Sequence, residues 1–283
     1  MTDQNCGILH PGAMGISVAA TMQNSGQTVY WASAGRSPAT QARAAEHDLI
    51  DAGSLAKLCA RCAVLVSVCP PDAAEAVAES VAQLGFKGLY IDANAIAPAR
   101  ALRLAQTLTQ AGVTFVDGGI IGGPAWEPDR TWLYLSGPAA DEAAACFSAG
   151  PLAAEVIGPE VGRASALKMC FAANTKGTTA LLCAVLGAAE NLGVREALER
   201  QWTRYDPASV AASHRRARGV TAKAWRFAGE MDEIAATFDS AGLPGGFHRA
   251  AGEVYSRLAG FKDAPELPEL IAVLQALQSD DTE

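Results

Sequence analysis

Short apolar runs alternate with longer alanine-rich stretches through residues 6–157. Apolar runs with few polar positions are typical of strands that are covered on both faces, and the stretches between them have the length of helices. The expected strands cover residues 6–9, 28–32, 63–68, 89–91 and 114–116, with two further strands at 132–135 and 155–157. The expected helices cover residues 16–25, 38–46, 71–84 and 98–111. This alternation predicts βαβ units and a parallel sheet, that is, an α/β domain.

A turn-rich segment at residues 158–162 ends this pattern, and no convincing strand follows it. Residues 165–192 predict one long helix, and shorter helices are expected at 196–204, 207–218, 223–240, 247–258 and 269–277. The long helix would span about 40 Å at 1.5 Å per residue, which is enough to connect two domains. The pattern therefore predicts an α/β domain over residues 1–161 and an all-helical domain over residues 162–283, joined by a long interdomain helix.

The composition excludes several classes of protein. The 283-residue chain has 22 basic and 30 acidic residues, and its net charge of −8 gives no general attraction to nucleic acids or anionic membranes. It has no basic N-terminal segment and no apolar run of about 18 residues, so we expect a cytoplasmic protein. The seven cysteines are scattered. We expect no metal site and interpret Cys59 and Cys62 as core residues rather than a redox or metal motif.

The loop after the first expected strand carries a candidate dinucleotide site. In a G-x-G-x-x-G fingerprint the first glycine forms a tight turn, the second admits a pyrophosphate, and the third lets the helix pack on the strand. An ordinary strand-to-helix turn is the alternative, but the position at the first βα junction favours a Rossmann domain. The three glycine places are filled by His10, Gly12 and Gly15, and the expected cofactor contacts are His10, Pro11, Gly12, Ala13, Met14 and Gly15.

The end of the second expected strand indicates which nucleotide binds. An acidic residue there binds the ribose 2′-OH of NAD, whereas an arginine accommodates the 2′-phosphate of NADP. Residues 31–37 contain no acid and offer Ser33, Arg36 and Ser37. These side chains favour NADP(H), and the alternative is that they are solvated loop residues.

Three separated segments carry a family resemblance. Residues 12–15 are similar to a G-x-M-G fingerprint, residues 117–123 to a substrate-binding D-x-P-x-S-G-G segment, and residues 158–168 to a glycine-rich approach to a catalytic lysine. In order and spacing they resemble the β-hydroxyacid dehydrogenase superfamily, which includes 3-hydroxyisobutyrate and 6-phosphogluconate dehydrogenases and the related imine reductases. Residues 166–255 are more similar to a subgroup whose phosphogluconate-dehydrogenase-like C-terminal domain has an unclear function.

The resemblance implies a catalytic group and an assembly. It implies that Lys168 is the general acid and base during hydride transfer, and that the chain forms a homodimer. A lysine in that role needs a lowered pKa, which apolar neighbours and a helix N-terminus favour. Weaker similarities at residues 69–71 and 92–98 add Cys69, Pro70 and Asn94 to the expected cofactor contacts.

Departures from the family pattern indicate a different substrate. Ile121 stands where the family has a serine that binds a carboxylate, and Ala172 stands where it usually has asparagine. At about 100° per residue, Thr175 would share a helix face with Lys168, whereas Asn174 would not. We expect a substrate that is bulkier and less polar than 3-hydroxyisobutyrate. The expected substrate contacts are Gly118, Gly119, Ile121, Gly122, Gly123, Trp126, Asn174, Thr175 and His248.

Several of these residues have plainer interpretations. Trp126 can also be interpreted as a packing residue, and His248 as a surface histidine. Residues 118–123 can be interpreted as a simple glycine turn. The basic run at residues 214–218 is interpreted as a solvated face.

The sequence therefore predicts an NADP(H)-dependent oxidoreductase that acts on a β-hydroxy acid or its carbonyl counterpart. The first alternative is an NADPH-dependent imine reductase, because the family serine and asparagine are absent, although imine reductases usually replace the lysine that Lys168 retains. The second alternative is a nucleotide-binding protein without dehydrogenase turnover, which His10 suggests. The identity of the substrate and the direction of the reaction stay open.

Overall fold

Parallel strands form the centre of the first structural unit. Within residues 4–278, which the computed structural model describes, eight strands make one sheet in the order β3-β2-β1-β4-β5-β6-β7-β8. Strands β1 to β6 are parallel, β7 is antiparallel to β6, and β8 is parallel to β7. The strands are β1 (Asn5–Ile8), β2 (Thr28–Trp31), β3 (Ile50–Asp51), β4 (Val64–Ser67), β5 (Leu89–Asp92), β6 (Thr114–Ile121), β7 (Thr131–Ser136) and β8 (Leu152–Val156).

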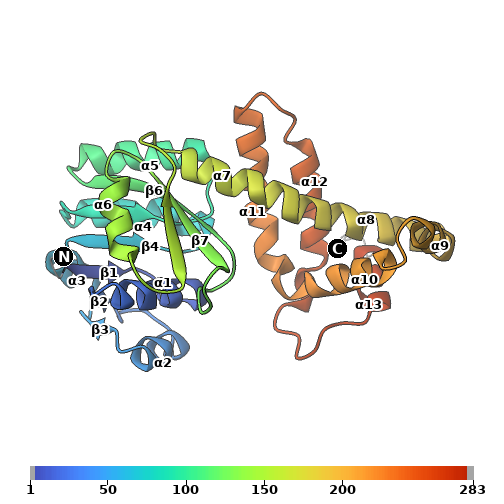
Figure 1. Cartoon of the computed structure of the whole chain (residues 1–283), viewed down its shortest axis with the longest axis horizontal. Helices are drawn as coiled ribbons and strands as arrows, with labels where there is room; N and C mark the ends of the chain where they lie inside the picture. Colours follow the sequence, from blue (N-terminus) through green and yellow to red (C-terminus); the bar gives the residue numbers. More distant parts are fainter. Residues whose placement is uncertain (1–3, 279–283) are drawn as a thin grey trace. The chain divides into compact units, whose positions relative to one another are not determined.

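Helices cover both faces of this sheet (Figure 1). One apolar core joins the sheet to α1 and α6, and a second core on the other face joins it to α3, α4 and α5. Ser37 and Ser54 accept the amide hydrogens that start α2 and α3. The helices are α1 (Ala13–Asn24), α2 (Pro38–Glu46), α3 (Leu55–Arg61), α4 (Ala74–Gln83), α5 (Pro98–Gln110) and α6 (Ala140–Ala144).

The sequence located most of this sheet correctly. The predicted Rossmann arrangement is confirmed, with the strand order reversing between β1 and β4, where ligands bind in such folds. The predictions missed β3 and α3, and they ended β6 at residue 116 although it continues to Ile121. The two further strands expected after β6 are present as β7 and β8, and β7 returns antiparallel beside β6, so the sheet is mostly parallel.

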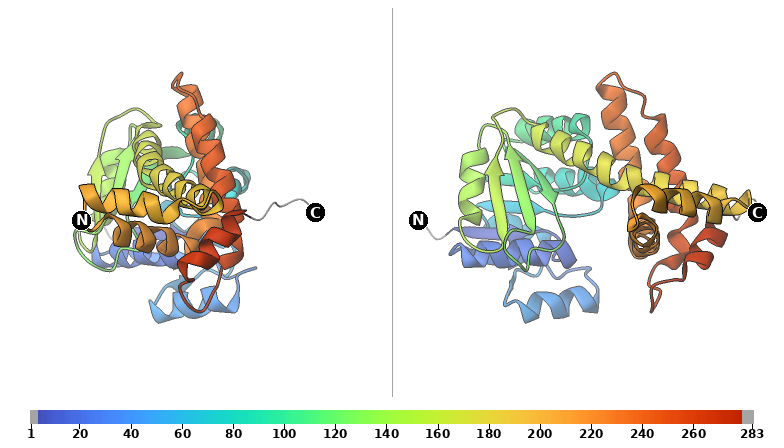
Figure 2. Two further views of the ribbon diagram at one scale, coloured as in Figure 1. Left: turned by 90° about the vertical axis from the view of Figure 1, so that its right-hand side faces the viewer. Right: turned by 45° about the vertical axis from the view of Figure 1, so that its right-hand side comes forward.

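The regular elements of the second unit, over its described residues 170–278, are all helices. One continuous helix runs from Arg163 to Asn191, and a single π-turn interrupts it at Ala173–Gly177. The long helices α11 and α12 pack side by side, and α8 contacts α10, α12 and α13 (Figure 2). The elements are α7 (Arg163–Ala172), α8 (Thr178–Asn191), α9 (Arg195–Tyr205), α10 (Ser209–Gly219), α11 (Thr221–Ser240), α12 (Gly246–Arg257) and α13 (Leu270–Gln278). The two compact units meet in sequence between residues 169 and 170, inside α7.

The segment Arg163–Asn191 is long and apolar enough to cross a membrane, judged by length and composition alone. This finding corrects the expectation that no apolar run reaches about 18 residues. Lysines interrupt the segment, but an 18-residue window within it still has a mean hydropathy of 1.3. Core helices of soluble proteins meet the same criterion, and α8 packs against α9, α10, α12 and α13 of its own unit.

Candidate functional site

The loop between β1 and α1 lies at the carboxyl end of the sheet. A Cβ atom on Gly15 would lie 2.0 Å from the His10 carbonyl oxygen, so only glycine allows α1 to start this close to the strand. A Cβ atom on Gly12 would meet no protein atom within 4 Å. No side chain caps α1, whose N-cap residue is Gly12. The loop therefore combines an uncapped helix N-terminus with open space, which is the requirement for binding an anion.

His10 fits the first glycine place without backbone strain. The described non-glycine residues with positive φ are Asp48, Asp129 and Asp263, so His10 does not need the freedom of glycine. Burial and the nearby Arg36 charge lower the pKa of His10 to about 4, which makes the imidazole neutral at pH 7. Its Nδ1 atom is buried and has no hydrogen-bond partner among the described residues.

Two arginines hold this loop from the neighbouring βα unit. The Arg36 guanidinium donates to the Leu9 carbonyl oxygen at 3.0 Å, and that of Arg43 donates to the Pro11 carbonyl oxygen at 3.3 Å. The other two residues expected here already have local partners. Ser37 caps α2, and the Ser33 amide donates to the Asp51 carboxylate at 3.2 Å. The structure thus brings Arg36 to the fingerprint loop, whereas Ser37 bonds within its own segment and Ser33 bonds to Asp51 of β3.

The ends of β4 and β5 are tied together beside this loop. The Asn94 side chain accepts from the Cys69 amide at 2.6 Å and donates to Ser67 and Asp92. Burial raises the pKa of the Cys69 thiol to about 11, so this thiol is protonated at neutral pH. Pro70, which follows Cys69, is exposed. Cys69, Pro70 and Asn94 are therefore neighbours, and Asn94 positions the backbone of the β4 loop.

Asp92 and Asp117 form a buried carboxyl pair on adjacent strands, where they are in register. Burial, together with the Asp117 charge, raises the pKa of Asp92 to about 7. Burial also raises the pKa of Asp117, although hydrogen bonds to its carboxylate oppose that shift. Each carboxyl group therefore depends on hydrogen bonds that replace lost water.

Asp117 anchors the helix that carries Lys168. Its carboxylate accepts from the Gly162 amide at 2.9 Å, the Ser165 amide at 3.0 Å, the Ser165 hydroxyl at 2.6 Å and the Ser136 hydroxyl at 3.0 Å. Ser136 in turn accepts from the Ala164 amide at 3.0 Å. These contacts satisfy the first amides of α7 and fix its start against β6 and β7. This role of Asp117 was not predicted, although its place directly before paired glycines was a signal.

Gly118 and Gly119 are not loop residues, which corrects the sequence prediction. Both are buried inside β6 and pair with β7. A Cβ atom on Gly119 would lie 2.6 Å from the Ala164 carbonyl oxygen and 3.0 Å from the Lys168 Cβ atom. Gly119 therefore serves the close packing of α7 on the sheet, and this packing places the half-buried Lys168 directly above β6.

The remaining residues of this segment lie where β6 turns into β7. Ile121 is buried and gives the end of β6 an apolar side chain. Gly122 and Gly123 are exposed, and Gly122 has a φ of +129°, which side chains rarely adopt. Trp126 is 47% exposed and stacks on His47 at 5.0 Å between ring centroids. Trp126 thus packs on the residue that follows α2, and almost half of its surface stays exposed to solvent.

The π-turn changes the predicted geometry around Asn174 and Thr175. Both residues are exposed and lie inside the π-turn, where hydrogen bonds skip one residue more than in an α-helix. The constant 100° per residue does not hold there, so the preference for Thr175 over Asn174 has no geometric basis. The Thr175 hydroxyl donates to the Phe171 carbonyl oxygen at 3.1 Å.

Side chains of the helical unit complete the π-turn. Arg216 donates to the Thr175 carbonyl oxygen at 3.0 Å and to the Thr179 hydroxyl at 2.7 Å, and it also bonds to Thr178. The Tyr255 hydroxyl donates to the Lys176 carbonyl oxygen at 2.7 Å. Arg215 and Arg216 are exposed, as a solvated face at residues 214–218 implies, but Arg216 also binds the long helix through these contacts.

His248 is buried, which corrects its interpretation as a surface histidine. Only 5% of the residue is exposed, and it packs between Phe238 and Phe247. A Cβ atom on Gly177 would lie 3.5 Å from the ring, so the glycine at the end of the π-turn makes room for it. Burial lowers the pKa of His248. Its Nδ1 atom has no partner among residues 4–278.

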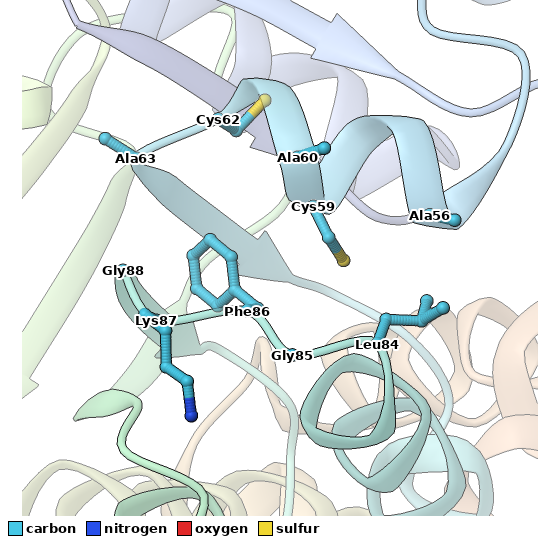
Figure 3. A pocket seen from close by; sticks show the side chains of 10 residues that line it. All are labelled: Ala56, Cys59, Ala60, Cys62, Ala63, Leu84, Gly85, Phe86, Lys87 and Gly88. Atoms are coloured by element: carbon cyan, nitrogen blue, oxygen red, sulfur yellow. The ribbon is translucent and has the colours of Figure 1, made fainter.

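A pocket of about 410 Å³ lies at the amino ends of β4 and β5, the edge opposite the fingerprint loop (Figure 3). Cys59 points into this pocket, whereas Cys62 points away from it and lies near Gly7 of β1. Burial raises the pKa values of these thiols to about 11 and about 12. The pair does not converge on one ligand. Among residues 4–278, no group of three or more His, Cys, Asp or Glu side chains is arranged to hold a metal ion.

Two family profiles match separate parts of the chain. Residues 6–146 match the NAD binding domain of 6-phosphogluconate dehydrogenase, and residues 189–258 match a domain of unknown function, DUF1932. No curated protein matches the chain.

Solved structures resemble the chain along almost its full length. A conserved hypothetical protein from Sinorhizobium meliloti is 25% identical, with a TM-score of 0.72 and coverage of 98% of this chain and 96% of its own. The 3-hydroxyisobutyrate dehydrogenase of Mycobacterium tuberculosis, solved with L-serine, is 17% identical, with a TM-score of 0.72 and coverage of 98% and 100%. An imine reductase variant from Myxococcus stipitatus, solved with NAD+, is 17% identical, with a TM-score of 0.57 and the same coverage.

Proposed function

We propose, from the premise that this chain belongs to the β-hydroxyacid dehydrogenase superfamily, that it is an NADP(H)-dependent oxidoreductase acting on a β-hydroxy acid or its carbonyl counterpart. Membership accounts for a nicotinamide cofactor and an oxidoreductase activity. The choice of NADP(H), the role of Lys168 and the substrate class are the parts that we add. The observation that carries the choice of nucleotide is the uncapped α1 N-terminus beside open space at Gly12, together with the arginine that reaches this loop.

The fingerprint loop fits a dinucleotide. The amides at the start of α1 would bind the pyrophosphate, and Gly12 would let it approach the backbone. Arg36, in the loop between β2 and α2, would bind the 2′-phosphate of NADP(H), and residues 31–37 contain no acid that would bind a free 2′-OH. When bound, NADP(H) supplies or accepts the hydride.

Lys168 is proposed to move the proton of the substrate hydroxyl. It lies on α7 above Gly119, where the Asp117 hydrogen bonds fix the helix. Its Nζ atom would take the proton from the alcohol during oxidation and return it during reduction. A contribution of this kind is typically worth about 10²–10⁴ in rate.

The proposed substrate is fairly bulky or apolar. Ile121 replaces the serine that would bind a small carboxylate, and its side chain is buried at the end of β6. Gly122 and Gly123 offer exposed backbone after this residue. Contacts from Trp126, Asn174, Thr175 and His248 belong to the same proposal. We also propose a cytoplasmic homodimer that does not bind nucleic acids or membranes.

An imine reductase is the second candidate. Ile121 and Ala172 remove two polar groups that suit a hydroxy acid, and this favours a substrate with a C=N bond. Lys168 favours the first candidate, since the related imine reductases usually replace it. The third candidate function is nucleotide binding without catalytic turnover.

The test is a titration of the purified chain with NADPH and with NADH, for wild type and Arg36→Ala. We expect tighter binding of NADPH, which Arg36→Ala weakens about tenfold or more while NADH binding changes little. If neither nucleotide binds, the proposed function is wrong.

Substrate screening then separates the three candidates. Hydroxy acids and cyclic imines are tested with the preferred nucleotide, using Lys168→Ala and Lys168→Arg. We expect turnover of a hydroxy acid that both variants reduce by about 10² or more without loss of NADPH binding, because arginine stays protonated. Turnover of imines that is independent of Lys168 would favour the second candidate, and binding without turnover would favour the third.

A further inference from the structure

His10 and Arg36 bring two buried nitrogen atoms without partners to the carboxyl end of the sheet. Neither the His10 Nδ1 atom nor the Arg36 Nε atom has a hydrogen-bond partner within residues 4–278. The two side chains are neighbours, because the Arg36 charge acts on His10 and the Arg36 guanidinium donates to the Leu9 carbonyl oxygen. Buried polar atoms normally find partners, so these two indicate a ligand at this place.

The backbone gives no reason for a histidine at this position. His10 occupies the first glycine place of the fingerprint, yet it is not among the residues with positive φ. The turn itself is closed by the Gly12 amide, which donates to the His10 carbonyl oxygen at 2.8 Å. The imidazole is therefore free to serve a purpose apart from the turn.

We propose that His10 and Arg36 together form the pocket for the 2′-phosphate of NADP(H), with His10 as a specificity-determining residue. This inference rests on the proposed function and adds a second phosphate ligand to it. The Leu9 contact uses one terminal amino group of Arg36, and the buried Nε atom stays without a partner among residues 4–278, as does the Nδ1 atom of the neighbouring imidazole. A phosphate has enough acceptor oxygens to bind both groups at once.

Charge explains why a phosphate suits this pair. An imidazole and a guanidinium repel each other when both are charged, and this repulsion contributes to the low pKa of His10 in the free protein. A dianion between them replaces repulsion by attraction to both groups. The carboxylate of Asp51, on β3, accepts from the amides of Ser33 and Gly53. A ribose 2′-OH offers no such charge, so NADH gains little from either side chain.

The experiment compares His10→Gly, His10→Ala and wild type by calorimetric titration. His10→Gly restores the family glycine and removes the ring, whereas His10→Ala removes the ring without adding backbone freedom. The ligands are NADPH, NADH, adenosine 2′,5′-bisphosphate and 5′-AMP, so that the 2′-phosphate is tested with and without the pyrophosphate. Thermal unfolding of each variant checks that the fold is intact.

We expect both variants to bind NADPH and the bisphosphate about tenfold more weakly, with NADH and 5′-AMP changed by less than about threefold. In combination with Arg36→Ala, the losses should be less than additive, because the two residues share one phosphate. Equal changes for NADPH and NADH, or no change, would overturn the role of His10 while the proposed function stands. Wild-type protein that binds neither nucleotide would instead reject the proposed function.

Discussion

The helical segment that carries Lys168 is held in different ways at its start and at its π-turn. At the start, backbone amides need acceptors, and the buried carboxylate of Asp117 receives four hydrogen bonds. At the π-turn, backbone carbonyls need donors, and they are reached by Tyr255 and by the exposed Arg216. Water can replace an exposed donor but not a buried acceptor. The start should therefore tolerate substitution far less than the π-turn.

The largest expected effect is the pH dependence of the buried pair beside the start. Asp92 ionises near 3.8 in the unfolded chain, whereas burial raises its pKa to about 7 in the folded protein. Between these values the unfolded chain loses a proton that the folded protein keeps, so stability falls as the pH rises. A difference of roughly three pKa units corresponds to about 4 kcal/mol.

Urea denaturation between pH 4 and pH 8 measures this slope for wild type and Asp92→Asn. The variant should show a flatter profile, because it has no proton to lose. Asp72→Asn, at an exposed position, is the control and should keep the wild-type slope. Parallel profiles for wild type and Asp92→Asn would show that Asp92 does not carry the effect.

The second largest effect on stability is expected when the carboxylate that accepts hydrogen bonds at the start of α7 is removed. Asp117→Ala leaves the amides of Gly162 and Ser165 without their partner inside the protein. We expect the free energy of unfolding to fall by about 3 kcal/mol, measured by urea denaturation. Asp141→Ala, at an exposed position in α6, should change it by less than about 0.5 kcal/mol. Similar values for the two variants would contradict the special role of the start.

Gly119→Ala tests whether close packing sets the position of Lys168. The new methyl group would lie 2.6 Å from the Ala164 carbonyl oxygen, so α7 must move away from β6. We expect a loss of about 2 kcal/mol by denaturation. Gly123→Ala is the matched control, since its methyl group would meet no atom within 4 Å. Equal stability of both variants would rule out this packing argument.

The smallest expected effect is at the π-turn. Arg216→Met removes the donors to Thr175 and Thr179, and we expect a loss of about 1 kcal/mol because water takes over part of these contacts. Hydrogen exchange should become faster at the amides of residues 173–179. Arg215→Met changes the exposed neighbour and should leave exchange there unaltered. A loss as large as that of Asp117→Ala would remove the contrast between the two ends.

Hydrophobic periodicity predicted most strands and helices because long elements bury many residues. It missed β3, since Ile50 and Asp51 are both exposed and leave no apolar pattern. It ended β6 too early because Gly118 and Gly119 look like a turn until α7 is known to pack against them. Glycine gives the same signal for both uses.

The candidate site was predictable to the extent that local motifs define it. The fingerprint loop and Arg36 are close in sequence to the strands that present them, and the structure brings them together. Asp117 and Arg216 act through partners 45 and 37 residues away, so the local sequence marks Asp117 only by the glycines that follow it and does not identify either partner. The π-turn was missed because the helical projection assumed one period throughout.

The contacts from Arg36 and Arg43 to the Leu9 and Pro11 carbonyl oxygens bear on protein engineering. Grafting a foreign segment in place of residues 33–43 would remove both tethers from the loop after β1, so the graft would alter a loop whose sequence it leaves unchanged. A donor protein should therefore contribute residues 9–12 together with residues 33–43 as one transplanted unit.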